Sequence, residues 1–250
     1  MRNNKYLKLA AALVFWLAVW QIASIFVGQK ILLPSPLDAV KSFFTIVFTA
    51  KFLSAVGFTV SKILSGFFLA LIASVVLVII SSVSKFAKAM ISPLMSALKS
   101  VPVASFVILA LIWINSAYLS AFICFVMVLP VLYINILSGI ESTPSDMKDM
   151  AKIYNIKPVK KALYIFTPNA LPYFKSGCKI ALGLCWKAGV AAELIGIPTG
   201  SVGEQLYFSK VYFLTSDLFA WTLVIILISV LFEKLFMYAL GLLTSLYERI

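Results

Sequence analysis

Charged side chains interrupt one long apolar stretch in the second half of the chain, residues 173–197. Two of them are Lys187 and Glu193, in the second half of the stretch, where Trp186 directly precedes Lys187. An ionisable side chain within an apolar segment is costly, so it usually binds something or pairs with a neighbour. Because Trp186 and Glu193 are seven residues apart, they share one helical face. We expect these three residues to line a solute pathway, with Lys187 available to an anion. A structural ion pair or a hydrogen bond to a neighbouring helix is the open alternative.

The sequence does not have the groups of residues that usually carry out catalysis or bind a metal. The chain has no histidine, and its three cysteines, Cys124, Cys178 and Cys185, all fall in apolar stretches. Cysteines that lack histidine partners are most simply small packing residues. The G-x-x-x-x-G-K-[ST] loop that cradles phosphates is also absent. We therefore expect no catalytic residues, no metal and no cofactor in this chain, which is not itself an enzyme.

The elements that must position these residues are membrane helices. Hydrophobic residues make up 62% of the 250 positions and charged residues 12%, whereas soluble domains carry about a quarter charged residues. A helix needs about 20 apolar residues to cross a bilayer, and backbone groups in lipid must be paired internally. The sequence predicts an all-α integral membrane protein with one domain, 1–250, and about six transmembrane helices. The expected spans are 7–27, 60–82, 89–114, 119–139, 173–197 and 218–243.

Basic residues predict the orientation of these spans. They gather before the first span, around the junction of the second and third, and in the loop 141–172, which lie on one side if the spans alternate. The positive-inside rule makes that side cytoplasmic, so both termini are expected there. The net charge of +12 then reports topology and not nucleic-acid binding, because no basic patch is interleaved with exposed aromatic residues. The residues are Arg2, Lys5, Lys8, Lys85, Lys88, Lys99, Lys148, Lys152, Lys157, Lys160 and Lys161.

Prolines mark the connections and bends. Pro34 and Pro36 predict a stiff extended turn after the first span, followed by an amphipathic helix on the outer surface, 37–51. Pro93 and Pro102 fall in the third expected span and Pro130 in the fourth. We expect each of them to kink its helix.

The loop 141–172 is the longest polar stretch and has the pattern of a helix pair. Thr143 suits an N-cap, Pro144 the first helical position and Asp146 a capping box, so a helix is expected over 144–154. Its apolar stripe comprises Met147, Met150, Ala151 and Tyr154. Asn155 tolerates the left-handed conformation that ends a helix. A second short helix is expected from Pro158 until Pro168 stops it. A capped pair with an adaptable apolar stripe predicts that a partner protein docks there.

The same loop resembles the permeases of bacterial ABC importers. Those permeases carry E-A-A, three residues, G, nine residues and I-x-L-P. Here Asp149-Met150-Ala151 stands at E-A-A, Asn155 at the glycine, and Ile165 and Pro168 at their offsets. The nitrate, sulfonate, taurine and thiamine-precursor branch of that family is also similar in three further segments. They are Leu33-Pro34-Ser35-Pro36, Lys99-Ser100-Val101-Pro102 and the stretch from Trp186 to Glu193.

The resemblance implies a type I importer in a bacterial cytoplasmic membrane. Its parts are two permease subunits, two cytoplasmic ATPase subunits that bind ATP and Mg²⁺, and an extracytoplasmic solute-binding protein. The loop 141–172 is then the coupling helix, touching the ATPase through Met147, Asp149, Met150, Ala151, Tyr154, Asn155, Ile165 and Pro168. We also hypothesise that the stretch 173–197 lines the pathway between the two permeases, because its many small residues permit close helix approach, and we expect the pair to be a homodimer. A heterodimer stays open, as does the solute.

Two other classes of function stay open from the residues alone. A secondary transporter often has internal repeats and discontinuous helices, and a membrane scaffold could recruit a partner through the loop without transporting anything. Neither would depend on an ATPase.

Overall fold

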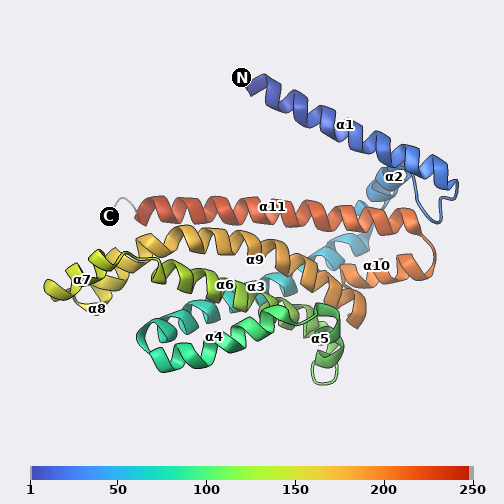
Figure 1. The fold of residues 1–250 in the computed structure, drawn as a ribbon. Helices are drawn as coiled ribbons and strands as arrows, with labels where there is room; N and C mark the ends of the chain where they lie inside the picture. The colour runs from blue at the N-terminus through green and yellow to red at the C-terminus, as the bar shows by residue number, and fades with distance from the viewer. Residues whose placement is uncertain (1, 248–250) are drawn as a thin grey trace.

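The computed structural model describes residues 2–247, and this part of the chain is helical without a β-strand (Figure 1). The long apolar stretches form the long helices, as their length and composition predict. In chain order the helices are α1 (Arg2–Val27), α2 (Pro36–Val47), α3 (Ala50–Val83), α4 (Lys85–Ser100), α5 (Val103–Ala110), α6 (Ser116–Glu141), α7 (Ser145–Ile153), α8 (Pro158–Lys161), the π-helix η1 (Ala162–Phe166), α9 (Thr167–Gly196), α10 (Val202–Val211) and α11 (Thr215–Tyr247).

The core of the bundle is α6, which packs most extensively against α9 and α3. Within its most apolar part 67% of the residues are buried, compared with 6% for α11 and none for α1. Small residues allow the close approach of these helices. A Cβ at Gly66 of α3 would lie 2.2 Å from the Ala121 carbonyl oxygen of α6, and one at Gly189 of α9 would lie 2.7 Å from Cys124 Sγ.

One buried tyrosine links α6 to two neighbours. The hydroxyl of Tyr133 lies 2.8 Å from the hydroxyl of Ser81 on α3 and 3.2 Å from that of Ser92 on α4. Tyr133 is 1% exposed, so these contacts satisfy a polar group that would be costly to bury alone.

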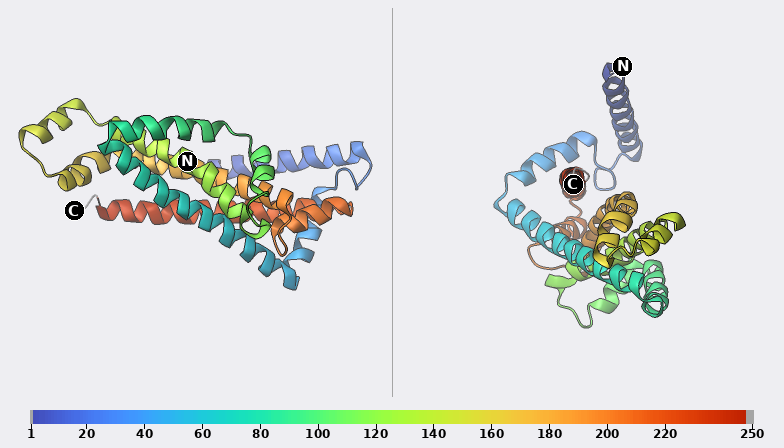
Figure 2. Two further views of the ribbon diagram at one scale, coloured as in Figure 1. Left: turned by 90° about the horizontal axis from the view of Figure 1, so that it is seen from below. Right: turned by 90° about the vertical axis from the view of Figure 1, so that its left-hand side faces the viewer.

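The helices α3, α6, α9 and α11 run between two ends of an elongated bundle, and α1 stands apart from it (Figures 1 and 2). The α3–α4 turn, α7, α8 and the end of α11 lie at one end, here named the α7 end. The other end, with α2, α5 and α10, is named the α10 end. Lys85, Lys88 and the lysines of the loop 141–172 therefore gather at one end, as expected. Lys99 does not: it is in the last turn of α4, about 20 Å along the helix from Lys85.

By length and apolar composition, four described helices could cross a membrane: α1, α3, α6 and α11. A fifth span results if α4 and α5 count as one. The helix α9 has 30 residues, but its lysines and Glu193 lower its apolar character. The expected six spans are reached only when this charged helix is included.

Three expected spans differ clearly from the structure. The second begins at Ala50, ten residues before the expected residue 60. The third is not a single kinked helix, because α4 and α5 meet at 103°. Pro102 is the N-cap of α5; it has no N–H and disfavours a helical conformation in the residue before it. Pro93 lies within α4 and Pro130 within α6 without ending either helix. The fifth span begins at Thr167 and not at residue 173.

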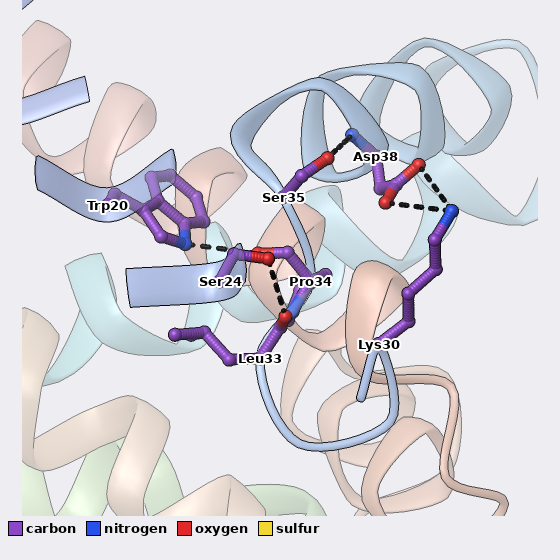
Figure 3. A network of polar contacts seen from close by, with 7 residues as sticks. All are labelled: Trp20, Ser24, Lys30, Leu33, Pro34, Ser35 and Asp38. Atoms are coloured by element: carbon purple, nitrogen blue, oxygen red, sulfur yellow. Dashed lines mark hydrogen bonds and ion pairs between the residues drawn. The ribbon is translucent and has the colours of Figure 1, made fainter. Parts of the chain in front are cut away.

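The connection from α1 to α2 is fastened by side-chain hydrogen bonds (Figure 3). The indole N–H of Trp20 donates to the Pro34 carbonyl at 3.1 Å, and the Ser24 hydroxyl donates to the Leu33 carbonyl at 3.0 Å. Ser35 caps α2 by accepting from the Asp38 N–H. The Ser35 hydroxyl and then Lys30 lower the pKa of the Asp38 carboxyl. The expected stiff turn is thus followed by a helix that ends at Val47, four residues earlier than predicted.

Candidate functional site

The helix pair α7–α8 extends beyond the other helices at the α7 end (Figure 1). The predicted turn at Asn155 is present: its φ is +47°, and the Ile156 N–H donates to the Ala151 carbonyl at 3.0 Å. This is the bond pattern that closes a helix with a left-handed residue. The predicted start of the second helix at Pro158 is also present.

The expected cap of α7 is wrong. Pro144 occupies the N-cap position without a side-chain hydrogen bond, and the helix begins at Ser145. Thr143 is 3% exposed, and its hydroxyl has no hydrogen-bond partner in the described part of the chain. The Thr143 hydroxyl is therefore buried and does not make the expected cap of the first turn of α7.

Pro168 does not stop the second helix, which is a further correction. The helical backbone continues from α8 through η1 into α9, and Pro168 directly follows the π-helical turn as the second residue of α9. Two side chains bond carbonyls of the π-helical turn. Thr167 Oγ1 donates to the Ala162 carbonyl at 2.9 Å, and Asn169 Nδ2 donates to the Ile165 carbonyl at 2.7 Å.

The two sides of α7 have different surroundings. Ala151 and Ile165 are buried, at 3% and 6% exposed, so they pack within the loop. Met147 and Met150 are each 44% exposed, and Met147 Sδ lies 3.8 Å from Asn169 Nδ2 of α9.

The most exposed apolar side chains of the turn that ends α7 are Ile153 (77%) and Tyr154 (76%). Asp149 lies opposite Ala151 on the helix and forms an exposed ion pair with Lys152 at 3.2 Å. We name Asp149, Met150, Ile153 and Tyr154 the α7 surface. Sequence reasoning missed Ile153, although it stands next to the stripe.

The pathway candidates separate into two places along α9. Trp186 and Lys187 line a cavity of about 420 Å³ between α9 and α11, to which Thr222, Ser229 and Glu233 also contribute. Trp186 is 4% exposed, and its indole N–H has no hydrogen-bond partner among the described residues. Lys187 is exposed. The cavity is thus lined by an aromatic and a basic residue of α9 and by an acidic residue of α11.

Glu193 lies elsewhere, fully buried near the α10 end. Its Oε2 accepts from the Thr59 hydroxyl of α3 at 2.7 Å and from the Gly203 N–H of α10 at 3.2 Å. Thr59 Oγ1 also accepts from the Val202 N–H at 2.9 Å. A carboxylate at the N-terminus of a helix is favoured by the free N–H groups and the dipole there. This is the arrangement of the open alternative, a hydrogen bond to neighbouring helices.

Lys62 of α3 is a charged residue that sequence reasoning overlooked. Its Nζ lies 4.1 Å from the centre of the Tyr118 ring and 5.6 Å from that of Phe58, an arrangement that stabilises a cation. The signal was present, because a lysine stands inside the expected span 60–82. Its aromatic neighbours could not be paired with it from sequence.

Comparison with known proteins gives matches over most of the chain. The family profile described as "Binding-protein-dependent transport system inner membrane component" matches residues 66–245. The nitrate import permease protein NrtB of Synechococcus elongatus is 28% identical over 201 residues, which cover 76% of this chain and 72% of that protein.

Two further relatives carry other substrate names. The putative aliphatic sulfonates transport permease protein SsuC of Bacillus subtilis is 25% identical over 207 residues, or 82% of this chain and 74% of that protein. The bicarbonate transport system permease protein CmpB of Synechococcus elongatus is 27% identical over 155 residues, or 62% and 55%. The range matched by the family profile includes α7, α8 and the whole of α9.

Proposed function

This chain belongs to the family of inner membrane components of binding-protein-dependent transport systems. On this basis we propose which of its helices contact the ATPase and which line the solute pathway. It is a permease subunit of an ABC importer, and a permease is not itself catalytic. Such permeases work with an ATPase and a solute-binding protein. We propose that two copies of this chain form one pathway in the cytoplasmic membrane. ATP and Mg²⁺ are then bound by the ATPase subunits, since this sequence lacks the phosphate loop.

The α7 surface is proposed to seat in a groove of the ATPase. The observation that carries this proposal is the exposure of Met150, Ile153 and Tyr154 on a helix that extends beyond the bundle. Exposed apolar side chains in a contiguous patch mark interaction sites, and methionine adapts to a partner's shape. Ala151, Ile165 and the Asn155 turn fix the shape of the loop, and Met147 packs it towards α9.

Closing of the ATPase pair on ATP then moves α7. Because α8, η1 and α9 follow one another without a break, a displacement of the loop is carried to the helix that holds Trp186 and Lys187. Rigid-body movement of helices is a common means of switching access.

Replacing Met150 by lysine tests the coupling role. A charge placed in an apolar protein interface is desolvated, so Met150→Lys should lower ATP-driven uptake by about tenfold or more. The measurement is uptake and ATP hydrolysis in vesicles holding the assembled complex, with assembly checked by co-purification of the ATPase. Ser145→Lys is the matched control, because it adds the same charge to the exposed polar start of α7. Normal uptake in Met150→Lys would show that the α7 surface is not the coupling element.

The solute is proposed to be a small anion. The relatives are named for nitrate, aliphatic sulfonates and bicarbonate, which are all anions, and Lys187 and Lys62 place positive charge on α9 and α3. In the same vesicles, Lys187→Met should lower anion uptake, whereas Lys8→Met, an exposed lysine of α1, should not. If neutral solutes inhibited uptake by competition and anions did not, a small anion would be excluded as the solute.

A further inference from the structure

A second cavity, of about 250 Å³, lies at the α7 end and has no part in the pathway or the α7 surface. It forms where the α3–α4 turn meets the last turn of α6, the start of α7 and η1. We name it the basic pocket. Its polar wall includes Lys85 and Lys88 of α4, Lys148 of α7 and Glu141 of α6, and its apolar wall consists of Leu137, Ile140 and Phe166.

The charges of the basic pocket do not balance. Glu141 pairs with Lys88, and Lys148 Nζ donates to the Glu141 carbonyl at 3.2 Å, so these two lysines converge on the C-terminus of α6. Lys85 forms no ion pair with an acidic side chain anywhere in residues 2–247. Three lysines against one carboxylate leave two positive charges in excess. An anion of two charges would neutralise them, and an anion of one charge would halve the excess.

The apolar wall shows what kind of anion fits. Leu137, Ile140 and Phe166 contribute no hydrogen-bond donors from their side chains, so a small hydrated ion would leave half of the pocket without complementary contacts. Beside the lysines, Val83 (84% exposed), Phe86 (76%) and Met90 (61%) present apolar side chains on the outer surface of the bundle. Basic and apolar surface thus meet along one edge.

The pocket also lies at the level expected for lipid headgroups. The apolar helix α3 ends at Val83 and α6 ends at Glu141, so the lysines are placed where hydrocarbon gives way to water. Basic pockets between membrane helices on the cytoplasmic side are suited to anionic headgroups.

We propose that the basic pocket binds the phosphate group of an anionic phospholipid, with Lys85, Lys88 and Lys148 around the phosphate and an acyl chain along Val83, Phe86 and Met90. Inorganic phosphate shares the headgroup's chemistry but not the chain. The site does not depend on the coupling role of α7, because none of its lining residues belongs to the α7 surface.

Lipid retention by the full-length chain tests the proposal. The chain is extracted from nanodiscs of phosphatidylcholine with a minor fraction of phosphatidylglycerol, and native mass spectrometry counts the lipids that stay bound. The wild type should retain phosphatidylglycerol in preference to phosphatidylcholine. Each lysine near an anionic group contributes about fivefold to affinity, so Lys85→Gln should lower retention about fivefold, and adding Lys148→Gln should lower it about 25-fold.

The controls separate this site from general surface charge. Lys85 has no ion-pair partner to lose, so Lys85→Gln decides the matter even if Lys148→Gln disturbs the fold. Lys85→Arg should keep retention, and Lys8→Gln, which removes an exposed lysine of α1, should leave it unchanged. Equal losses in Lys8→Gln and Lys85→Gln would refute the pocket. Full displacement of phosphatidylglycerol by millimolar inorganic phosphate would refute a lipid as the ligand.

Discussion

At the scale of the residue, Glu193 joins three helices at the α10 end. It belongs to α9, accepts a hydrogen bond from Thr59 of α3 and caps the start of α10 through Gly203. The fit is tight, because a Cβ at Gly203 would lie 2.2 Å from Glu193 Cβ. The side chain therefore positions α10 against α9, whatever role it has towards solute.

Two substitutions of Glu193 distinguish structure from transport. Glu193→Ala leaves the Thr59 hydroxyl and the Gly203 N–H without their acceptor and opens a cavity, so we expect a loss of about 2–4 kcal/mol. Glu193→Gln keeps the shape and an acceptor oxygen, so its thermal midpoint in detergent should stay close to that of the wild type.

Uptake by the Glu193→Gln complex decides between the two roles. If the side chain is structural, uptake follows stability and the glutamine variant transports normally. A glutamine variant that is fully stable but inactive would show that the charge itself serves the pathway.

At the scale of the element, the contact of α3 with α6 depends on a glycine. Gly66→Ala would place Cβ 2.2 Å from a backbone oxygen, which cannot move as a side-chain end can. Overpacking of this kind costs about 1–3 kcal/mol, and we expect the thermal midpoint to fall by several degrees.

Gly183→Ala of α9 is the matched control for that substitution. Nothing lies within 4 Å of its Cβ position, and alanine favours a helix over glycine by up to about 1 kcal/mol. Its midpoint should be unchanged or higher. A Gly66→Ala variant as stable as Gly183→Ala would mean that α3 and α6 are packed less tightly than the structure shows.

The helices themselves could be predicted from sequence, whereas their ends and breaks could not. Runs of apolar residues in α3, α6 and α11 leave no other structure possible in lipid. Prolines are poorer predictors of where a helix ends, because a proline can bend a helix, cap it or leave it unchanged according to its surroundings. Pro102 ends α4, Pro130 lies within α6, and Pro168 is accommodated because Thr167 and Asn169 bond the carbonyls of η1.

At the scale of the whole molecule, the orientation in the membrane can be tested by thiol labelling. The native cysteines are all buried, so they should not react. A cysteine in place of Asn115, between α5 and α6 near the α10 end, should react with an impermeant maleimide in intact cells. A cysteine in place of Lys160 of α8 should react only after the membrane is opened. The reverse pattern would invert the proposed topology.

The candidate sites were predicted from sequence to different extents. The loop 141–172 carries its own signals, since Asn155 and Pro158 act on neighbouring residues. Glu193 shows only that a charge lies in an apolar stretch. Its partners are 134 and 10 positions away, and only the packing of α3, α9 and α10 brings them together. Lys62 and Tyr118 were missed for the same reason.

The unbroken helical path from Pro158 to Gly196 links the two ends of the molecule mechanically. Its axis is on the order of 55 Å long, with the α7 surface at one end and the Glu193 cap of α10 at the other. Because α8, η1 and α9 follow one another without a break, a rotation applied at α8 would be carried along this axis towards α10. The five residues of η1 form a π-helical turn, which holds about one residue more than an α-helical turn. Deleting one of them would restore an α-helical turn and keep the two ends in nearly the same orientation, whereas deleting one residue of α9 would turn them by about 100° relative to each other.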